Sequence, residues 1–230
     1  MNTTDTEKDI MDLNKHIEFF NPKELIKEEI HILGCGALGS NVALQLAKLG
    51  LEKIILWDYD TVEPHNITNQ VYDSTDIGKL KVDALKEHLL KQNPEMNIIT
   101  KGKYTGQILK GIVIFCIDSV ETKYKIADKN RFNIAIKLII DGAIGLSTGQ
   151  VYCVNWSSQK IVNDYIEQIN FKDSEVQVPV SACGTTLSVS PSVLVTASFM
   201  VSALINYAKG SKIPFLVLLD AFEYNIRKIK

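Results

Sequence analysis

The residues best suited to chemistry begin with a glycine-rich loop, Gly34-Cys35-Gly36-Ala37-Leu38-Gly39, which lies between an apolar run and a helical pattern. Glycines in a GxGxxG loop allow a tight turn and let the backbone approach a phosphate, while the following helix offers unpaired N–H groups at its N-terminus. A second apolar run ends on Asp58, about 20 residues past the loop, where a carboxylate reaches ribose hydroxyls. This spacing predicts a nucleotide site and leaves both ATP and a dinucleotide open.

Two more aspartates, Asp118 and Asp141, follow apolar runs that are typical of buried strands. Ligands of open parallel sheets bind outside the carboxyl ends of the strands, so we expect both carboxylates and Asp58 at the edge that holds the glycine loop. Asp118 is suited to Mg²⁺, which prefers carboxylate, water and phosphate oxygens, and Lys81 is suited to a β- or γ-phosphate. The competing interpretation is structural, because aspartate also caps turns and helices.

Alternating strand and helix patterns must position these residues. We predict an α/β fold, with a Rossmann-like, mostly parallel sheet, helices on both faces and an antiparallel C-terminal extension after Gly149. Residues 1–28 are expected to form a partly flexible N-terminal segment, residues 29–230 a single domain, and residues 156–178 a polar crossover. The predicted strands span 30–33, 53–57, 97–100, 111–117, 138–140, 150–155, 215–219 and 224–230, and the main helices 37–49, 81–91, 120–130 and 191–209.

Composition narrows the functional class. The 230-residue chain carries a net charge of −2 and offers no basic footprint, so we expect no nucleic-acid partner. The apolar stretch 193–205 is shorter than the roughly 20 residues of a membrane span, so we expect no membrane partner either. The four cysteines include no CxxC pair, which predicts no structural zinc and favours a reduced, cytoplasmic setting.

The sequence beyond the glycine loop carries a more specific signal. The polar stretch from Asp58 to Gln70, followed by Ile77 to Val82 and then by Asp118 to Lys123, resembles in order and spacing the signature of the ThiF/MoeB/HesA family. These are adenylyltransferases similar to ubiquitin-activating enzymes, and the chain is most similar to their small, single-domain ThiF-like type. The resemblance covers about residues 29–123 and continues more loosely toward the C-terminus.

The resemblance implies a reaction. It predicts ATP-dependent adenylation of the C-terminal carboxylate of a small ubiquitin-like protein, sulfur-carrier protein or peptide, which gives an acyl-adenylate and pyrophosphate. ATP and Mg²⁺ are the implied cofactors, and a homodimer is the implied assembly. The implied catalytic residues are Lys81, Asp118 and Asn69, with Asp118 holding the metal, and the implied ATP-binding residues are Gly34, Gly36, Ala37, Gly39, Asp58, Asp60, Asn66, Lys81 and Lys123.

Several positions depart from the family pattern. Asn69 stands where well-studied members have arginine, so the site lacks that fixed cation and its forked donors. Lys123 also replaces an arginine, and it supplies a point charge without the fork. No arginine precedes the glycine loop, whereas in family dimers an arginine of the N-terminal segment commonly reaches into the partner's site. Cys183 follows the crossover, where some relatives place an acyl-accepting thiol, although a lone cysteine is more often a buried structural residue.

Two other functions stay open at this point. Asn69 favours a catalytically impaired nucleotide-binding scaffold or sensor of the same fold. The glycine loop and Asp58 alone would also suit an NAD-dependent oxidoreductase, although such an enzyme has no evident use for the polar stretch from Asp60 to Gln70.

Overall fold

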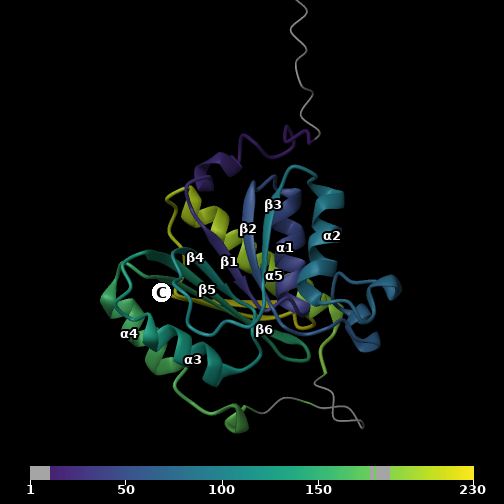
Figure 1. The fold of residues 1–230 in the computed structure, drawn as a ribbon. Helices are drawn as coiled ribbons and strands as arrows, with labels where there is room; N and C mark the ends of the chain where they lie inside the picture. The colour runs from purple at the N-terminus through teal and green to yellow at the C-terminus, as the bar shows by residue number, and fades with distance from the viewer. Residues whose placement is uncertain (1–10, 177–178, 180–186) are drawn as a thin grey trace, which may run out of the picture.

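The computed structural model describes residues 11–176, 179 and 187–230 (Figure 1). The candidate thiol Cys183 lies outside the described residues.

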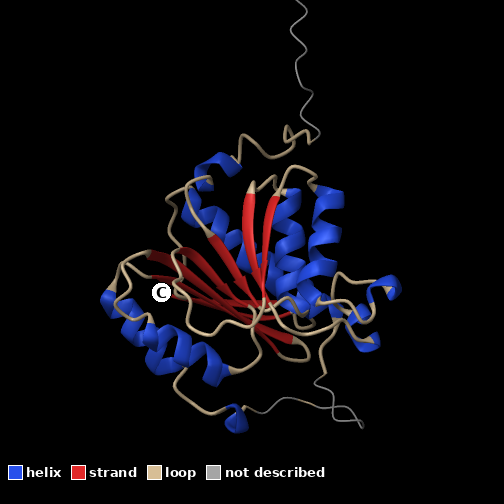
Figure 2. Cartoon of the chain, viewed as in Figure 1, coloured by secondary structure: helices blue, strands red, loops and turns tan. Residues whose placement is uncertain are grey.

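The described residues form one sheet of eight strands in the order β3-β2-β1-β4-β5-β6-β7-β8 (Figure 2). The strands from β3 to β5 pair in parallel, whereas β6, β7 and β8 join in antiparallel fashion. The predicted fold class is therefore confirmed. The strands are β1 (Ile30–Leu33), β2 (Lys53–Trp57), β3 (Asn97–Lys101), β4 (Gly111–Phe115), β5 (Ile136–Ile144), β6 (Thr148–Asn155), β7 (Leu216–Asp220) and β8 (Asn225–Ile229).

Helices cover both faces of this sheet (Figure 1). One core lies beneath α1, α2 and α5, and a second lies beneath α3 and α4 on the opposite face. The short helix η1 (Pro22–Leu25) precedes β1, and its Leu25 is buried in the first core. The α-helices are α1 (Ala37–Lys48), α2 (Lys81–Gln92), α3 (Val120–Lys129), α4 (Gln159–Gln168) and α5 (Ser190–Ala208).

The central strands β1 and β4 determine where a ligand can bind. Both are buried along their whole length, as expected of strands that are covered on two faces. The chain proceeds outward from β1 through β2 to β3 and then continues with β4 on the other side of β1. This reversal is a topological switch point, and ligands of open α/β sheets bind there, outside the carboxyl ends of the strands.

Two details of the predicted secondary structure are wrong. The polar crossover contains α4, which buries Val162, Tyr165 and Ile166 against the second core. Their helical spacing was a readable signal that the polar composition obscured. The strand predicted at 138–140 extends through Asp141 to Ile144, because antiparallel pairing with β6 continues along the whole of β5.

Helix α5 is longer than the apolar stretch that marks it in the sequence. Its 19 residues and mean hydropathy of 1.4 would allow a membrane span by length and composition alone. In the structure α5 packs across α1, β5 and β6, and it buries Val193, Ala197 and Met200. The core helix of a soluble protein passes the same test, so the expectation of no membrane partner stays a prediction.

Candidate active site

The glycine loop lies at the switch point and packs against the chain that leaves β4. Gly34 has a φ of +95°, and a Cβ there would lie 2.6 Å from the carbonyl oxygen of Cys116. A Cβ on Gly39 would overlap the carbonyl oxygen of Gly34. Steric demands inside the protein therefore explain both of these glycines.

Gly36 is different, because no neighbouring atom crowds the position of a side chain there. A Cβ there would meet no atom within 4 Å, and the φ of Gly36, −77°, lies outside the left-handed region that favours glycine. Gly36 caps α1, which begins at Ala37 and whose first turn points its N–H groups out of the sheet edge. Open space in front of a helix N-terminus fits a phosphate group.

Asp58 follows β2 directly and is tied to the glycine loop. Its Oδ2 accepts a hydrogen bond from the backbone N–H of Cys35 at 2.6 Å, and its Oδ1 accepts one from the N–H of Asp60 at 2.8 Å. A carboxylate oxygen accepts more than one hydrogen bond. The half-buried Asp58 can therefore hold the loop and still accept a ribose hydroxyl.

Lys81 begins α2, and Asp60 fixes its position. Its Nζ donates to Asp60 Oδ2 at 3.1 Å, and its backbone N–H donates to the carbonyl oxygen of Asp60 at 2.9 Å. The side chain is 10% exposed. An ammonium carries three donors, so two are left for phosphate oxygens. Lys81 is therefore built into the same network as the glycine loop, unlike a solvated lysine on a helix surface.

Tyr72 links these parts, and the sequence pattern did not single it out. Its hydroxyl lies 2.7 Å from the carbonyl oxygen of Cys35, to which it donates, and 3.2 Å from that of Lys81. Burial raises the pKa of Tyr72 far above its ordinary value, so the hydroxyl stays protonated. A tyrosine inside a polar loop was the available signal, because a buried tyrosine needs a hydrogen-bond partner.

Two 3₁₀ helices, η2 (Pro64–Thr68) and η3 (Ser74–Asp76), give the polar loop after β2 a defined shape. Asn66 lies in η2, is 5% exposed, and accepts a hydrogen bond from the N–H of Glu63 through Oδ1 at 2.9 Å. The structure thus gives Asn66 a role in ordering the loop.

Asn69 ends η2 and joins it to two other elements. Its Nδ2 donates to Ser188 Oγ at 2.7 Å, just before α5. Its carbonyl oxygen accepts a hydrogen bond from Asn41 Nδ2 on α1 at 3.1 Å. The neutral residue Asn69 therefore connects the polar loop after β2 to α1 and to the segment just before α5.

Asp118 lies across the switch point from Asp58. Gly34 packs against the backbone of Cys116 and Ile117, which directly precede Asp118. The side chain is exposed, so its carboxylate is accessible to a cation. The next residue, Ser119, caps α3 by accepting a hydrogen bond from the N–H of Thr122.

The arrangement of a glycine loop, a strand-end aspartate and a helix-start lysine agrees with the comparison with known families. A model of the ThiF family matches residues 17–230. The chain belongs to the ThiF family. The resemblance that the sequence motifs carry is therefore confirmed.

Curated ThiF-type relatives are longer proteins. The chain is 31% identical over 144 residues to the adenylyltransferase and sulfurtransferase UBA4 of Saccharomyces cerevisiae, an alignment that covers 59% of this chain and 32% of UBA4. It is 32% identical over 122 residues to ubiquitin-like modifier-activating enzyme 5 of Caenorhabditis elegans, which covers 45% of this chain and 29% of that protein. The aligned part is thus about a third of each relative's length.

Solved structures share the fold. E. coli MccB crystallised with ATP superposes with a TM-score of 0.66 and 21% identity, covering 90% of this chain and 64% of that chain. PaaA superposes with a TM-score of 0.71 and 21% identity, covering 95% of this chain and 68% of that chain. At this identity the likeness shows the fold alone.

Lys123 is buried in this ThiF-family fold and pairs with Asp141. It is 2% exposed, and its Nζ lies 2.6 Å from Asp141 Oδ1 and donates to the carbonyl oxygen of Gly142 at 2.9 Å. Tyr165 on α4 donates to Asp141 Oδ2 at 3.0 Å. Asp141 pairs with Phe115 at the carboxyl end of β4, so it lies level with the expected edge. The expectation that its strand ends there is wrong, because β5 continues to Ile144 and the carboxylate is buried as the counter-ion of Lys123.

The described cysteines are poor nucleophiles. Burial raises the pKa of Cys116 and of Cys153 to about 12 and the pKa of Cys35 well above its ordinary value. All three thiols are therefore protonated at neutral pH, and the thiolate is the reactive form.

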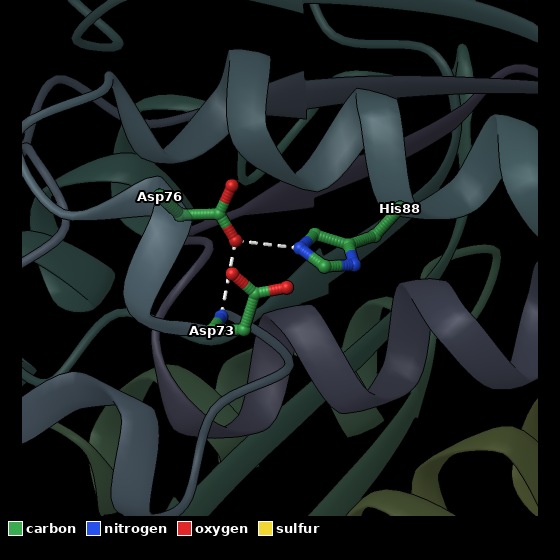
Figure 3. A group of neighbouring side chains, drawn as sticks. All are labelled: Asp73, Asp76 and His88. Atoms are coloured by element: carbon green, nitrogen blue, oxygen red, sulfur yellow. Dashed lines mark hydrogen bonds and ion pairs between the residues drawn. The ribbon is translucent and has the colours of Figure 1, made fainter.

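A second polar cluster lies beside α2 (Figure 3). Asp76 Oδ2 accepts hydrogen bonds from His88 Nε2 at 2.6 Å and from the N–H of Asp73 at 3.0 Å, as the dashed lines show. The ligand atoms of Asp73, Asp76 and His88 lie within 4.8 Å of one another, a spacing that would suit a metal ion. However, Lys79 Nζ lies 3.1 Å from Asp76 Oδ1 and already supplies positive charge. We therefore assign the cluster to holding η3 against α2, near Lys81.

Asp76→Asn is expected to lower the free energy of unfolding by about 2 kcal/mol at pH 7. Burial alone would raise the pKa of Asp76, but the hydrogen bonds from His88, the Asp73 backbone and Lys79 outweigh it and lower the pKa to about 2. A lowered folded-state pKa stabilises the protein above the unfolded value of about 4, and this stabilisation is lost as the pH falls through about 2.

Urea unfolding of both proteins at pH 7 and at pH 3 measures this effect. The loss should shrink at pH 3, and Asp164→Asn, an exposed site on α4, should change little at either pH. An equal loss at both pH values would show that the charge of Asp76 is not what stabilises the fold.

A hollow of about 480 Å³ lies at the amino ends of β1, β2 and β3, where Ile30, Lys53 and Asn97 line it. Ligands of such sheets bind at the carboxyl ends, so we assign this hollow no part in the nucleotide site.

Proposed function

We propose that this chain catalyses ATP-dependent adenylation of the C-terminal carboxylate of a small ubiquitin-like protein, sulfur-carrier protein or peptide. The observation that carries the proposal is the single hydrogen-bonded network that joins the glycine loop, Asp58, Asp60 and Lys81 at the switch point. The curated relatives support it, since UBA4 is named an adenylyltransferase and the C. elegans protein an activating enzyme of ubiquitin-like modifiers.

The reaction needs alignment and charge compensation. A carboxylate oxygen of the substrate bonds to the α-phosphorus of ATP, the bond from that phosphorus to the oxygen that bridges the β-phosphate breaks, and its electron pair leaves with pyrophosphate. Asp58 holds the ribose, the α1 N-terminus at Gly36 and Ala37 receives phosphate oxygens, and Lys81 donates to the β- or γ-phosphate. Asp118 would hold Mg²⁺, which when bound neutralises phosphate charge.

ATP–pyrophosphate exchange tests the proposal. The chain is incubated with ATP, Mg²⁺, labelled pyrophosphate and, one at a time, small carrier proteins or peptides that end in Gly-Gly. We expect label to enter ATP only when a suitable carrier is present. Absence of exchange with every carrier, in a chain that binds ATP measurably, would count against the proposal.

A catalytically impaired scaffold or sensor is the second candidate, and Asn69 is the observation that favours it. The amide has no charge, and its Nδ2 is engaged with Ser188. Asn69→Arg decides between the two functions. Activity that appears only in the variant supports the scaffold, whereas robust exchange by the native chain excludes it.

An NAD-dependent oxidoreductase is the third candidate, and the glycine loop alone permits it. Calorimetric titration with ATP and with NAD separates the two ligands. We expect ATP with Mg²⁺ to bind, whereas tight NAD binding without ATP binding would overturn our assignment.

Gly36→Ala is expected to weaken ATP binding by at least about tenfold, because the new methyl group enters the space in front of α1. The fold should tolerate it, at a cost of about 1 kcal/mol or less for a changed helix cap. Gly34→Ala is the matched comparison, and it should instead destabilise the fold, since its Cβ meets Cys116 and its φ is +95°.

Calorimetry and thermal unfolding of both variants check this pair. Unchanged ATP affinity in a folded Gly36→Ala chain would show that no phosphate of ATP binds in front of Gly36.

Three finer points belong to the same proposal. Cys183 is the candidate acyl acceptor, and loss of a thioester but not of the acyl-adenylate in Cys183→Ser would support it. We further propose a homodimer, for which the exposed small residues Ser198 and Ser202 of α5 are the support. The scattered cysteines support a reduced, cytoplasmic location.

A further inference from the structure

Asp173 makes an unusual contact between two distant parts of the chain. It begins η4 (Asp173–Glu175), after α4, and its carboxylate lies at the N-terminus of α3. Oδ2 accepts a hydrogen bond from Ser119 Oγ at 2.7 Å, and Oδ1 accepts one from the N–H of Glu121 at 3.0 Å. The N–H of Asp173 in turn donates to Glu121 Oε1 at 3.3 Å. These hydrogen bonds, which involve side chains and backbone groups of both segments, hold η4 against the start of α3.

This contact satisfies a helix end that would otherwise attract an anion. The first N–H groups of α3 have no partner within the helix, and a negative charge is favourable there. Burial alone would raise the pKa of Asp173, but the hydrogen bonds from Ser119 and the Glu121 backbone outweigh it and lower the pKa, so the carboxylate is ionised at neutral pH. With Asp173 on the α3 N-terminus, that helix end is already occupied, whereas the α1 N-terminus faces open space at Gly36.

The same contact fixes the backbone next to Asp118. Ser119 is both the immediate neighbour of Asp118 and the N-cap of α3, and Asp173 holds its hydroxyl. Asp118 is exposed between partly buried neighbours that join β4 to α3, so the local chain direction depends on how α3 begins. A metal ligand must be held within a few tenths of an ångström of its working position.

We propose that Asp173 is a positioning residue, which holds Asp118 in place for Mg²⁺ and keeps phosphate away from the N-terminus of α3. The inference rests on the proposed function, because it assigns Mg²⁺ and ATP to this edge of the sheet. Through Asp173, the segment after α4 is thus linked to the nucleotide site.

Calorimetric titration of ATP over a series of Mg²⁺ concentrations tests this role. In Asp173→Asn, the Mg²⁺ concentration that gives half of the gain in ATP affinity should rise about tenfold, a shift of the size seen when outer-shell partners of metal ligands are removed. ATP affinity in EDTA should stay within about twofold of the native value. A general loss of structure would instead lower both affinities.

Two further variants make the result specific. Glu175→Gln removes one negative charge from the same η4 and should leave the Mg²⁺ dependence unchanged. Among the described residues, the Glu175 carboxylate accepts a hydrogen bond from the nearby N–H of Lys172. Ser119→Ala removes the partner hydroxyl, so it should shift the Mg²⁺ dependence in the same direction. The double variant with Asp173→Asn should show less than the sum of the two effects, because the residues act through one contact.

The outcomes separate this inference from the proposed function. A tenfold shift in Mg²⁺ dependence with no adenylation of any carrier supports the positioning role and counts against adenylation. Unchanged Mg²⁺ dependence in a chain that performs exchange overturns the positioning role alone. If the native chain binds no ATP at all, both are overturned.

Discussion

Asp118→Asn is expected to lower the rate of ATP–pyrophosphate exchange by about 10²–10³-fold. Asp118 supplies a carboxylate at the edge where Gly34 packs against the chain leaving β4, and it is exposed to solvent. Asparagine keeps the shape of the side chain but removes the charge that Mg²⁺ prefers. The loss should therefore fall on the step in which charge develops on the leaving pyrophosphate.

Three measurements keep this result specific. ATP affinity in EDTA should hardly change, because the ribose and the α1 N-terminus make contacts that do not involve Asp118. The thermal unfolding midpoint should stay near the native value. Asp128→Asn, an exposed carboxylate near the other end of α3, should keep full exchange activity. Native exchange rates in a folded Asp118→Asn chain would show that Asp118 takes no part in the reaction.

Lys123→Met is expected to lower the free energy of unfolding by about 3–5 kcal/mol. The lysine is 2% exposed and Asp141 is 4% exposed, so the variant leaves a buried carboxylate without its counter-ion. Among the described residues, Tyr165 would then be left to donate a hydrogen bond to that carboxylate. Desolvation of an unpaired charge, rather than loss of packing volume, is the physical cause.

Two comparisons isolate the buried pair in urea unfolding. Lys125→Met lies on the same helix with its side chain 75% exposed, and it should cost less than about 1 kcal/mol. The double variant Lys123→Met with Asp141→Asn removes both charges and should recover much of the loss, since the new amide still accepts the Tyr165 hydrogen bond. If the double variant is no more stable than Lys123→Met alone, charge burial does not explain the effect.

The parts of the fold that could be predicted are those whose signals are local. The apolar runs that became β1, β2 and β4 are short and bounded by polar residues, and their bounds in the structure match the prediction within two residues. The glycine loop predicted both the strand-to-helix turn and the edge of the sheet at which this turn lies. A turn of this type binds ligands at the carboxyl ends of the strands. Asp58, Asp60 and Lys81 converge there because each follows or begins a regular element.

The parts that could not be predicted depend on partners far apart in the chain. Lys123 and Asp141 looked like two ligand-edge residues, because nothing in either local pattern shows that they neutralise each other in the core. Tyr72 and Asp173 were missed for the same reason, since their partners Cys35 and Ser119 belong to other elements. In the sequence, Asn69 could be judged only by comparison with the arginine of the family pattern. Its contact with Ser188 joins two segments that are far apart in the chain.

Transfer of AMP to a carrier tests the central claim most directly. The chain is incubated with Mg²⁺, ATP labelled at the α-phosphate, and a carrier protein that ends in Gly-Gly, and the carrier is then separated under acidic conditions. We predict label on the carrier together with an equal amount of released pyrophosphate, and both products at a rate about 10²–10³-fold lower with the Asp118→Asn chain. A chain that binds ATP but leaves every carrier unlabelled would contradict the account.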